Sequence, residues 1–128
     1  MPEAATQSSM PAVDHETLRT LEEEVAAGIP EIMLDLLDTF INDTPHHIQV
    51  LAAYQPGDDP AQVMRSAHSL KSSAATFGAH PLAQLCARIE GLAREGNLEE
   101  LPQMVEQVQA EYRTVKAILE EERARLAE

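Results

Sequence analysis

The chain has 128 residues, with 22 acidic and nine basic side chains, a formal net charge of −13 and only four aromatic residues. A chain of this length can bury one core, which must here be built mainly from Leu, Ile, Val, Ala and Met, and such a core favours packed helices over strands. The negative charge disfavours nucleic acids and anionic membranes as partners, and favours another protein.

The cysteine content and the hydropathy of the chain exclude further classes of protein. The single cysteine, Cys86, excludes an internal disulfide framework and a cysteine-rich zinc site, and we expect it to be a small buried apolar residue. Residues 1–12 lack the basic start and apolar run of a signal peptide, and no later segment approaches 18 apolar residues. We therefore expect a cytoplasmic, monomeric protein with a flexible tail over 1–12 and one helical domain over 13–128.

The sequence predicts two helices in the first half of that domain. A short first helix carries Leu18, Leu21 and Val25 and ends at Gly28. The second begins at Pro30, and Pro45 inside it is expected to kink or loosen it. Its wide apolar stripe consists of Ile32, Met33, Leu36, Leu37, Phe40, Ile41, Ile48 and Leu51.

Three more helices follow, separated by short loops rich in Gly and Pro. Asp59 is expected to cap the first of them, and Asn97 with Glu100 suggests a capping box before the last. Short loops connect antiparallel neighbours, so the predicted fold is all-α, an antiparallel up-down four-helix bundle with an additional short N-terminal helix. The last helix repeats apolar residues at three-four spacing, at Leu98, Leu101, Val105, Val108, Tyr112, Val115 and Leu119.

The helix predicted over residues 60–77 carries an exposed histidine. His68 points about 140° away from Val63, which lies on the core-facing line of this helix. Lys71 follows His68 by three residues on the exposed side. The core-facing line comprises Val63, Ala67, Leu70, Ala74 and Phe77, whereas the surface stripe around His68 also carries Met64, Ser72 and Ala75.

An exposed imidazole beside an ammonium group is suited to carrying a phosphoryl group. Neutral imidazole is a nucleophile near pH 7, because its ordinary pKa is about 6.5. Lys71 could neutralise the charge of a phosphoryl group on the ring, and small residues after it allow a partner to approach closely. The alternative is that His68 and Lys71 are ordinary surface residues.

The segment AHSLKSSAATFGA resembles the signature of histidine-containing phosphotransfer (HPt) domains of multistep phosphorelays. The resemblance extends over most of residues 14–115. Ser72 stands where the family often has Gly, and since Ser is also small we expect slightly tighter partner contact with function retained. The matching residues are His68, Leu70, Lys71, Ser73, Gly78 and Ala79.

The resemblance implies a phosphohistidine carrier rather than an enzyme with its own ATP-dependent kinase activity. His68 would accept a phosphoryl group from the aspartyl phosphate of one receiver domain and pass it to the aspartate of another. The implied partners are response-regulator receiver domains and a hybrid sensor histidine kinase. No cofactor is implied for this chain, because Mg²⁺ would come with the receiver.

The resemblance also implies roles for two residues on the following helix. Relatives have a Gln or Glu at the position of Glu90, where it accepts a hydrogen bond from the imidazole and leaves Nε2 free to attack. Arg94 matches a basic residue that lies near the site in some relatives. The alternative is a solvated Glu90 paired only with Arg94. We expect the receiver to pack against the surface formed by Met64, Ser72 and Ala75.

Two other classes of function are weaker alternatives. A di-iron bundle needs Glu-x-x-His pairs, which this sequence lacks, and the adjacent His46 and His47 point about 100° apart on a helix. We therefore expect no metal site. The second alternative is a non-catalytic helical adaptor that binds receiver domains or another protein without phosphotransfer.

Overall fold

The computed structural model describes residues 10–128, so most of the tail predicted over 1–12 lies outside the described residues. Every regular element within residues 10–128 is helical, which confirms the all-α class and the short N-terminal helix. None of these helices is both long enough and apolar enough to cross a membrane. The elements are α2 (His15–Thr20), the π-helical turn η1 (Leu21–Val25), α3 (Pro30–Ala53), α4 (Ala61–Thr76), α5 (His80–Arg94) and α6 (Leu101–Ala127).

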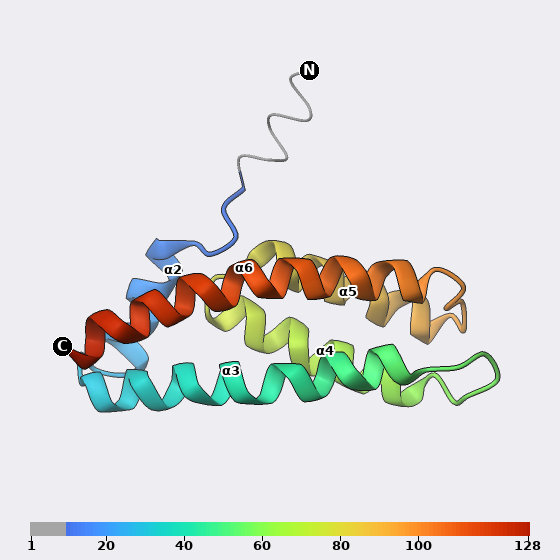
Figure 1. The fold of residues 1–128 in the computed structure, drawn as a ribbon, viewed down its shortest axis with the longest axis horizontal. Coiled ribbons are helices and arrows are strands. Elements are labelled where there is room, and N and C mark those ends of the chain that lie inside the picture. The colour runs from blue at the N-terminus through green and yellow to red at the C-terminus, as the bar shows by residue number, and fades with distance from the viewer. Residues whose placement is uncertain (1–9) are drawn as a thin grey trace, which may run out of the picture.

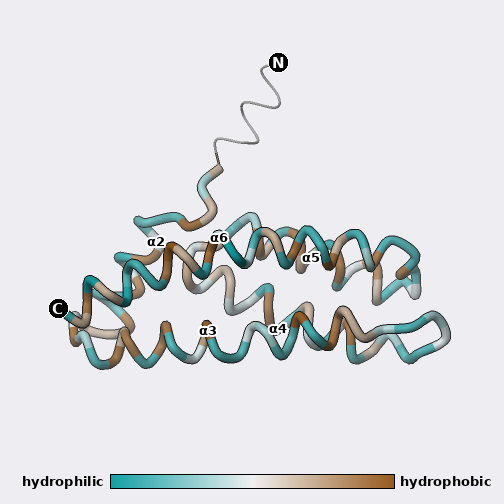
Figure 2. The backbone as a smooth tube through the Cα atoms, viewed as in Figure 1, coloured by the Kyte–Doolittle hydropathy of each residue, from teal (hydrophilic) through white to brown (hydrophobic). Residues whose placement is uncertain are grey.

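The long helices lie side by side along the longest axis of the molecule. In Figure 1, α3 and α6 lie in front of α4 and α5, and the loops that follow α3 and α5 lie at the end opposite the C-terminus. Polar and apolar residues alternate along each helix in Figure 2, as expected when one face of every helix packs inward. The most extensive contact between two helices joins α4 and α5.

The predicted core face of α4 is confirmed. The five residues predicted for this face each have at most 5% of their surface exposed; they are Val63, Ala67, Leu70, Ala74 and Phe77. Cys86 is fully buried as expected, and burial raises the pKa of its thiol to about 12. Val25 and Ile32 were predicted to face the core but are 64% and 40% exposed, because both lie next to the α2–α3 turn at the edge of the core.

Pro45 lies inside helix α3, which runs without a break from Pro30 to Ala53. Proline has no backbone N–H, so the carbonyl of Ile41 loses its partner four residues later in the helix. The hydroxyl of Tyr112 on α6 donates to that carbonyl at 2.9 Å. A side chain from a neighbouring helix therefore replaces the missing hydrogen bond and joins α3 to α6.

The helix starts agree only partly with the sequence. Helix α4 begins at Ala61 with Pro60 at the N-cap position, one residue later than predicted, but the side chain of Asp59 still accepts a hydrogen bond from the backbone N–H of Ala61 at 3.0 Å. The predicted capping box before the last helix is wrong, because α6 begins at Leu101 and no side chain caps it. Leu98 instead enters the core from the preceding loop, and the helix starts later, with Pro102 in its first turn.

The N-terminal segment is hydrogen-bonded to the turn between α4 and α5. The backbone N–H of Asp14 donates to the carbonyl of Gly78 at 2.8 Å. Gly78 has φ +78°, and a Cβ atom there would lie 2.7 Å from the carbonyl oxygen of Asp14. This close backbone contact requires glycine and holds the C-terminal end of α4 in place.

Candidate functional site

The site is built on α4 and centres on His68. The neighbouring residues Ala67 and Leu70 are buried in the core, so α4 is anchored through the side opposite the imidazole. The His68 side chain is 59% exposed, as the helical periodicity predicts. The ring is therefore open to an incoming partner, while the helix under it is fixed by packing.

Glu90 reaches this ring from α5. Only 6% of the surface of Glu90 is exposed, so the alternative that Glu90 is a solvated surface acid is wrong. Nδ1 of His68 lies 2.9 Å from Oε2 of Glu90, and Nζ of Lys71 donates to Oε1 at 2.6 Å. The two oxygens of one carboxylate thus bind the imidazole and the ammonium group at the same time.

The charge of Glu90 fixes the protonation of the ring. The hydrogen bond from Lys71 and, to a smaller extent, that from His68 hold the pKa of the Glu90 carboxyl below its ordinary value, against the opposing effect of burial. An ionised carboxylate can only accept hydrogen bonds, so Nδ1 of the neutral imidazole must carry the proton. Nε2 then holds the free lone pair, and no residue among 10–128 forms a hydrogen bond with it.

Arg94 lies one turn after Glu90 on the same helix. Its guanidinium nitrogen is 3.3 Å from Oε2 of Glu90, and 64% of its side chain is exposed. The structure therefore brings all four predicted residues, His68, Lys71, Glu90 and Arg94, into one network around a single carboxylate. Lys71 contacts Glu90 in this network, and its role towards a phosphoryl group stays a prediction.

The predicted docking residues lie on the same side of α4. Met64 is half-buried and packs against the edge of the core, whereas Ser72 and Ala75 are exposed. A shallow pocket of about 290 Å³ beside the imidazole is lined by Met64, His68, Glu90 and Arg94. Arg65 also lines this pocket, although the sequence analysis did not select it; its position one turn before His68 was the available signal.

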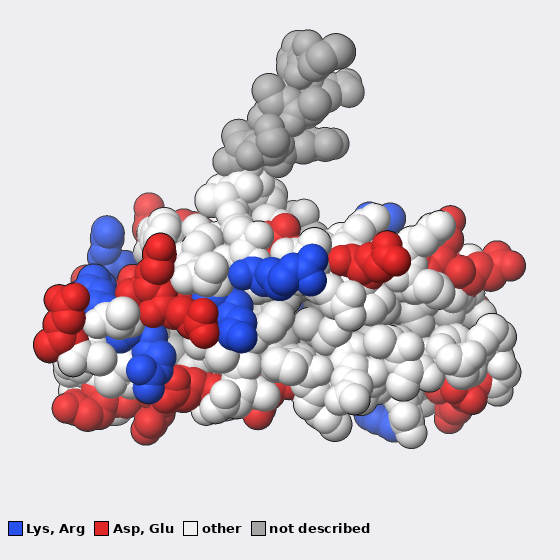
Figure 3. Space-filling model, in the orientation of Figure 1, with Lys and Arg blue, Asp and Glu red and all other residues white. Residues whose placement is uncertain are grey.

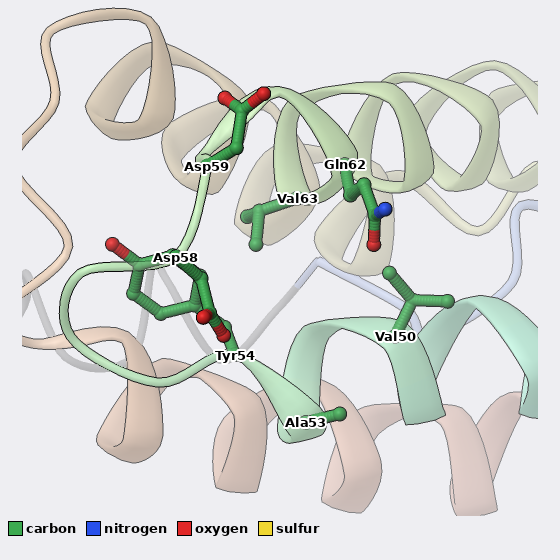
Figure 4. Close-up of a pocket in the computed structure, with 7 residues that line it drawn as sticks. All are labelled: Val50, Ala53, Tyr54, Asp58, Asp59, Gln62 and Val63. Atoms are coloured by element: carbon green, nitrogen blue, oxygen red, sulfur yellow. The ribbon is translucent and has the colours of Figure 1, made fainter.

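Other polar features lie away from this network. A larger pocket, about 410 Å³, is formed where the end of α3 and its loop meet the start of α4 (Figure 4), and neither His68 nor Glu90 lines it. Gln62, Val50 and Tyr54 contribute to its wall. Within the described part of the chain, residues 10–128, no three His, Cys, Asp or Glu side chains gather in a way that could hold a metal ion.

Comparisons with known proteins agree with this geometry. The family model of the Hpt domain matches residues 35–118, which include the four residues of the network. The phosphorelay protein LuxU from two strains of Vibrio vulnificus is 28% identical over 111 residues, covering 86% of this chain and 94% of LuxU. Histidine-containing phosphotransfer protein B from Pseudomonas aeruginosa PAO1, whose crystal structure is known, is 32% identical in sequence to this chain. The two structures superimpose with a TM-score of 0.81 over 91% of this chain and 98% of that protein's chain. With a match over about two thirds of its length and a shared fold, the chain belongs to the Hpt domain family.

Proposed function

We propose that this protein carries phosphoryl groups between receiver domains, with Nε2 of His68 as the atom that is phosphorylated. The observation that carries the proposal is an exposed imidazole whose Nδ1 proton is held by a buried, ionised carboxylate at 2.9 Å. The names of the relatives, a phosphorelay protein and a phosphotransfer protein, support the same role. The relatives and the family support an intermediate of a phosphorelay, and the transfer from receiver to receiver is the further step proposed here.

The transfer reaction needs no external base. The lone pair on Nε2 attacks the phosphorus of an aspartyl phosphate, the bond between phosphorus and the aspartate oxygen breaks, and the aspartate leaves as a carboxylate. The ring keeps its proton on Nδ1 and becomes positively charged. Glu90 stabilises that charge through the existing hydrogen bond, and attack by a second receiver aspartate reverses each bond change.

The cationic side chains would bind the transferred group. Lys71 is one helical turn from His68, and its ammonium group can share its three donors between Glu90 and a phosphoryl oxygen. Arg94 is largely exposed and holds Glu90 at a longer distance, 3.3 Å, so it can turn towards the phosphoryl group at small cost. Both residues therefore neutralise phosphoryl charge in this proposal.

Partner binding would use the surface formed by Met64, Ser72 and Ala75. A receiver domain would pack on this surface, and the receiver would bring the Mg²⁺ that phosphoryl transfer from aspartate requires. We propose that a hybrid sensor histidine kinase is the upstream partner, and that the protein acts as a cytoplasmic monomer. In this proposal α3 to α6 form an up-down four-helix bundle without an ATP site.

The test is phosphoryl transfer from a radiolabelled receiver domain to the wild type, to His68→Gln and to His46→Gln. His46 is an exposed histidine on α3, so its replacement controls for the loss of a surface imidazole. We expect an acid-labile, alkali-stable label on the wild type and on His46→Gln, and none on His68→Gln. Since His68 is exposed, its replacement should change the free energy of unfolding by about 0.5 kcal/mol or less.

The outcomes separate the two classes of function. If no receiver labels the folded wild-type protein, the carrier role is contradicted and a receiver-binding adaptor becomes the better explanation. If His68→Gln still accepts a label, the assignment of the phosphorylated atom is wrong.

A further inference from the structure

The charges of this protein are divided between its two helical layers. Residues 61–94, which contain α4 and α5, hold four of the nine basic residues and one of the 22 acidic residues. The formal charge of this segment is therefore +3, and that of the remaining chain is −16. The single acid is Glu90, which is buried and paired.

Helices α3 and α6, which form the opposite layer, hold nine acidic and four basic residues, a formal charge of −5. The other acidic residues outside residues 61–94 lie before α3, in the loops or at Glu128. Figure 3 shows the side of the molecule with α3 and α6 in front, where acidic side chains gather towards both ends and basic side chains lie among and between them. Helices α4 and α5 lie behind this layer in Figure 1. The protein thus has an electrical polarity, and His68 lies on its basic side.

Three basic residues surround His68, and their partners differ. Lys71 and Arg94 both form ion pairs with Glu90. Arg65 is exposed, lines the pocket beside the imidazole, and has no carboxylate within 4 Å among residues 10–128. Arg65 is therefore the basic side chain beside His68 that is not already neutralised by this protein.

We propose that Arg65 steers the acidic phosphorylation site of a receiver domain to His68, on the face where the proposed function places the receiver. This inference rests on the proposed carrier function, because it takes the receiver as the occupant. A receiver that holds Mg²⁺ must supply carboxylate ligands for it, so the rim of its phosphorylation site is acidic. The charge of residues 61–94 is complementary to such a rim, and the charge of the other layer repels it.

Steering of this kind acts on the rate of association. Complementary charges raise association rate constants by about 10-fold to 1,000-fold at low salt, and added salt removes most of that gain. A partner that approaches α3 or α6 meets repulsion, so fewer encounters occur on the wrong side. Arg65 raises the rate at which a receiver reaches His68, and Lys71 and Arg94 act on the phosphoryl group once it is in place.

The test compares Arg65→Glu with Arg113→Glu. Arg113 is exposed on α6 and has no carboxylate within 4 Å among residues 10–128, so the two variants have the same net charge and differ in the position of the change. The second-order rate constant of phosphoryl transfer from a receiver domain, phosphorylated with acetyl phosphate in the presence of Mg²⁺, is measured by rapid quench at about 20 mM and about 500 mM salt.

We expect Arg65→Glu to lower this rate constant about five- to tenfold at low salt and less than about twofold at high salt. Arg113→Glu should change it less than about twofold at either salt concentration. Equal effects of the two variants, or an effect of Arg65→Glu that does not depend on salt, would overturn the steering role. Circular dichroism establishes that both variants are folded.

The control for the underlying function is the wild-type protein itself. If it accepts no label from any receiver, the carrier function fails and the docking inference fails with it. If the wild type is labelled while Arg65→Glu and Arg113→Glu behave alike, the carrier function stands and only the inference about Arg65 is wrong. Binding of the His68→Gln protein to the same receiver, followed by fluorescence anisotropy, should show the same preference for an intact Arg65.

Discussion

Nδ1 of His68 lies 2.9 Å from Oε2 of Glu90, and these two atoms belong to side chains 22 positions apart in the sequence. The distance is set by the packing of α4 on α5, each of which buries an apolar face that includes Leu70 on α4 and Ile89 on α5. Because Lys71 donates a hydrogen bond to Glu90, the Glu90 carboxylate stays charged despite its burial and can only accept hydrogen bonds. The packing of two apolar faces therefore determines which nitrogen of an exposed ring is nucleophilic.

Removal of the Glu90 side chain should change the tautomer of His68. For the neutral imidazole of the wild type, we expect ¹⁵N NMR to show a protonated Nδ1 and an unprotonated Nε2. In Glu90→Ala, the proton should move mainly to Nε2, the tautomer favoured by a free histidine side chain, and phosphoryl acceptance should fall on the order of tenfold. Glu90→Gln should keep the wild-type tautomer, because its amide oxygen can still accept from Nδ1.

A matched control for the tautomer measurement is Glu95→Ala. Glu95 is exposed at the end of α5, so its replacement removes one negative charge without touching the ring. The same tautomer in the wild type and in Glu90→Ala would show that the carboxylate does not position the proton.

The pH dependence of stability should also reveal the Glu90 network. The hydrogen bond from Lys71 lowers the pKa of Glu90 in the folded state below the value of 4.5 that an unperturbed glutamate has. Its ionised form therefore stabilises the fold at pH values above that ordinary value, and the contribution disappears as the pH falls through the lowered pKa. We expect the wild type to be more stable than Glu90→Gln at pH 7, and the difference in free energy of unfolding to shrink as the pH falls below 4.5 and through the lowered pKa of Glu90.

Urea denaturation at a series of pH values measures this difference directly. Asp14 and Asp38 also have lowered pKa values, through Thr17 and Arg123, but both are present in the wild type and in the variant, so their contributions cancel. A difference that is constant from pH 7 to pH 3 would contradict the ionic role of Glu90.

Helical periodicity was sufficient to predict the core face of α4 and the exposure of His68. These features depend on the angle between neighbouring residues of one helix, which the sequence contains in full. The burial of Glu90 could not be derived in this way, because it depends on how closely α5 approaches α4. Only the resemblance to the family pointed to that contact.

Element boundaries and compensating contacts were the least predictable features. The capping box at Asn97 was wrong because burial of Leu98 keeps the chain in a loop until Leu101. The local signal for a cap is worth about 1 kcal/mol, and burial of a leucine contributes more. The position of Arg65 one turn before His68 was a signal in the sequence, but its lack of an acidic partner is visible only in three dimensions.

Gly78→Ala should destabilise the protein more than replacement of other glycines with similar dihedral angles. The new Cβ would lie 2.7 Å from the carbonyl oxygen of Asp14 and 3.1 Å from Cβ of Thr17, so the N-terminal segment must move. Gly96 has a similar φ, +76°, but a Cβ atom there would meet no other atom within 4 Å, which makes Gly96→Ala the control for backbone strain alone. We expect a loss of about 1 kcal/mol for Gly96→Ala and about 3 kcal/mol for Gly78→Ala in urea denaturation. Equal losses would show that the contact with Asp14 adds nothing to stability.

The hydrogen bond from Tyr112 to Ile41 should depend on Pro45. Burial raises the pKa of Tyr112 to about 12, so the hydroxyl remains a hydrogen-bond donor at neutral pH. It donates to the carbonyl of Ile41, to which Pro45 has no N–H to donate. Tyr112→Phe should therefore cost about 1–2 kcal/mol of unfolding free energy, since it leaves that carbonyl without a donor. In a Pro45→Ala background the alanine N–H can bond to Ile41, so the same replacement should cost about 0.5 kcal/mol or less. A double-mutant cycle in urea measures the difference, and an additive result would contradict the compensation between the two helices.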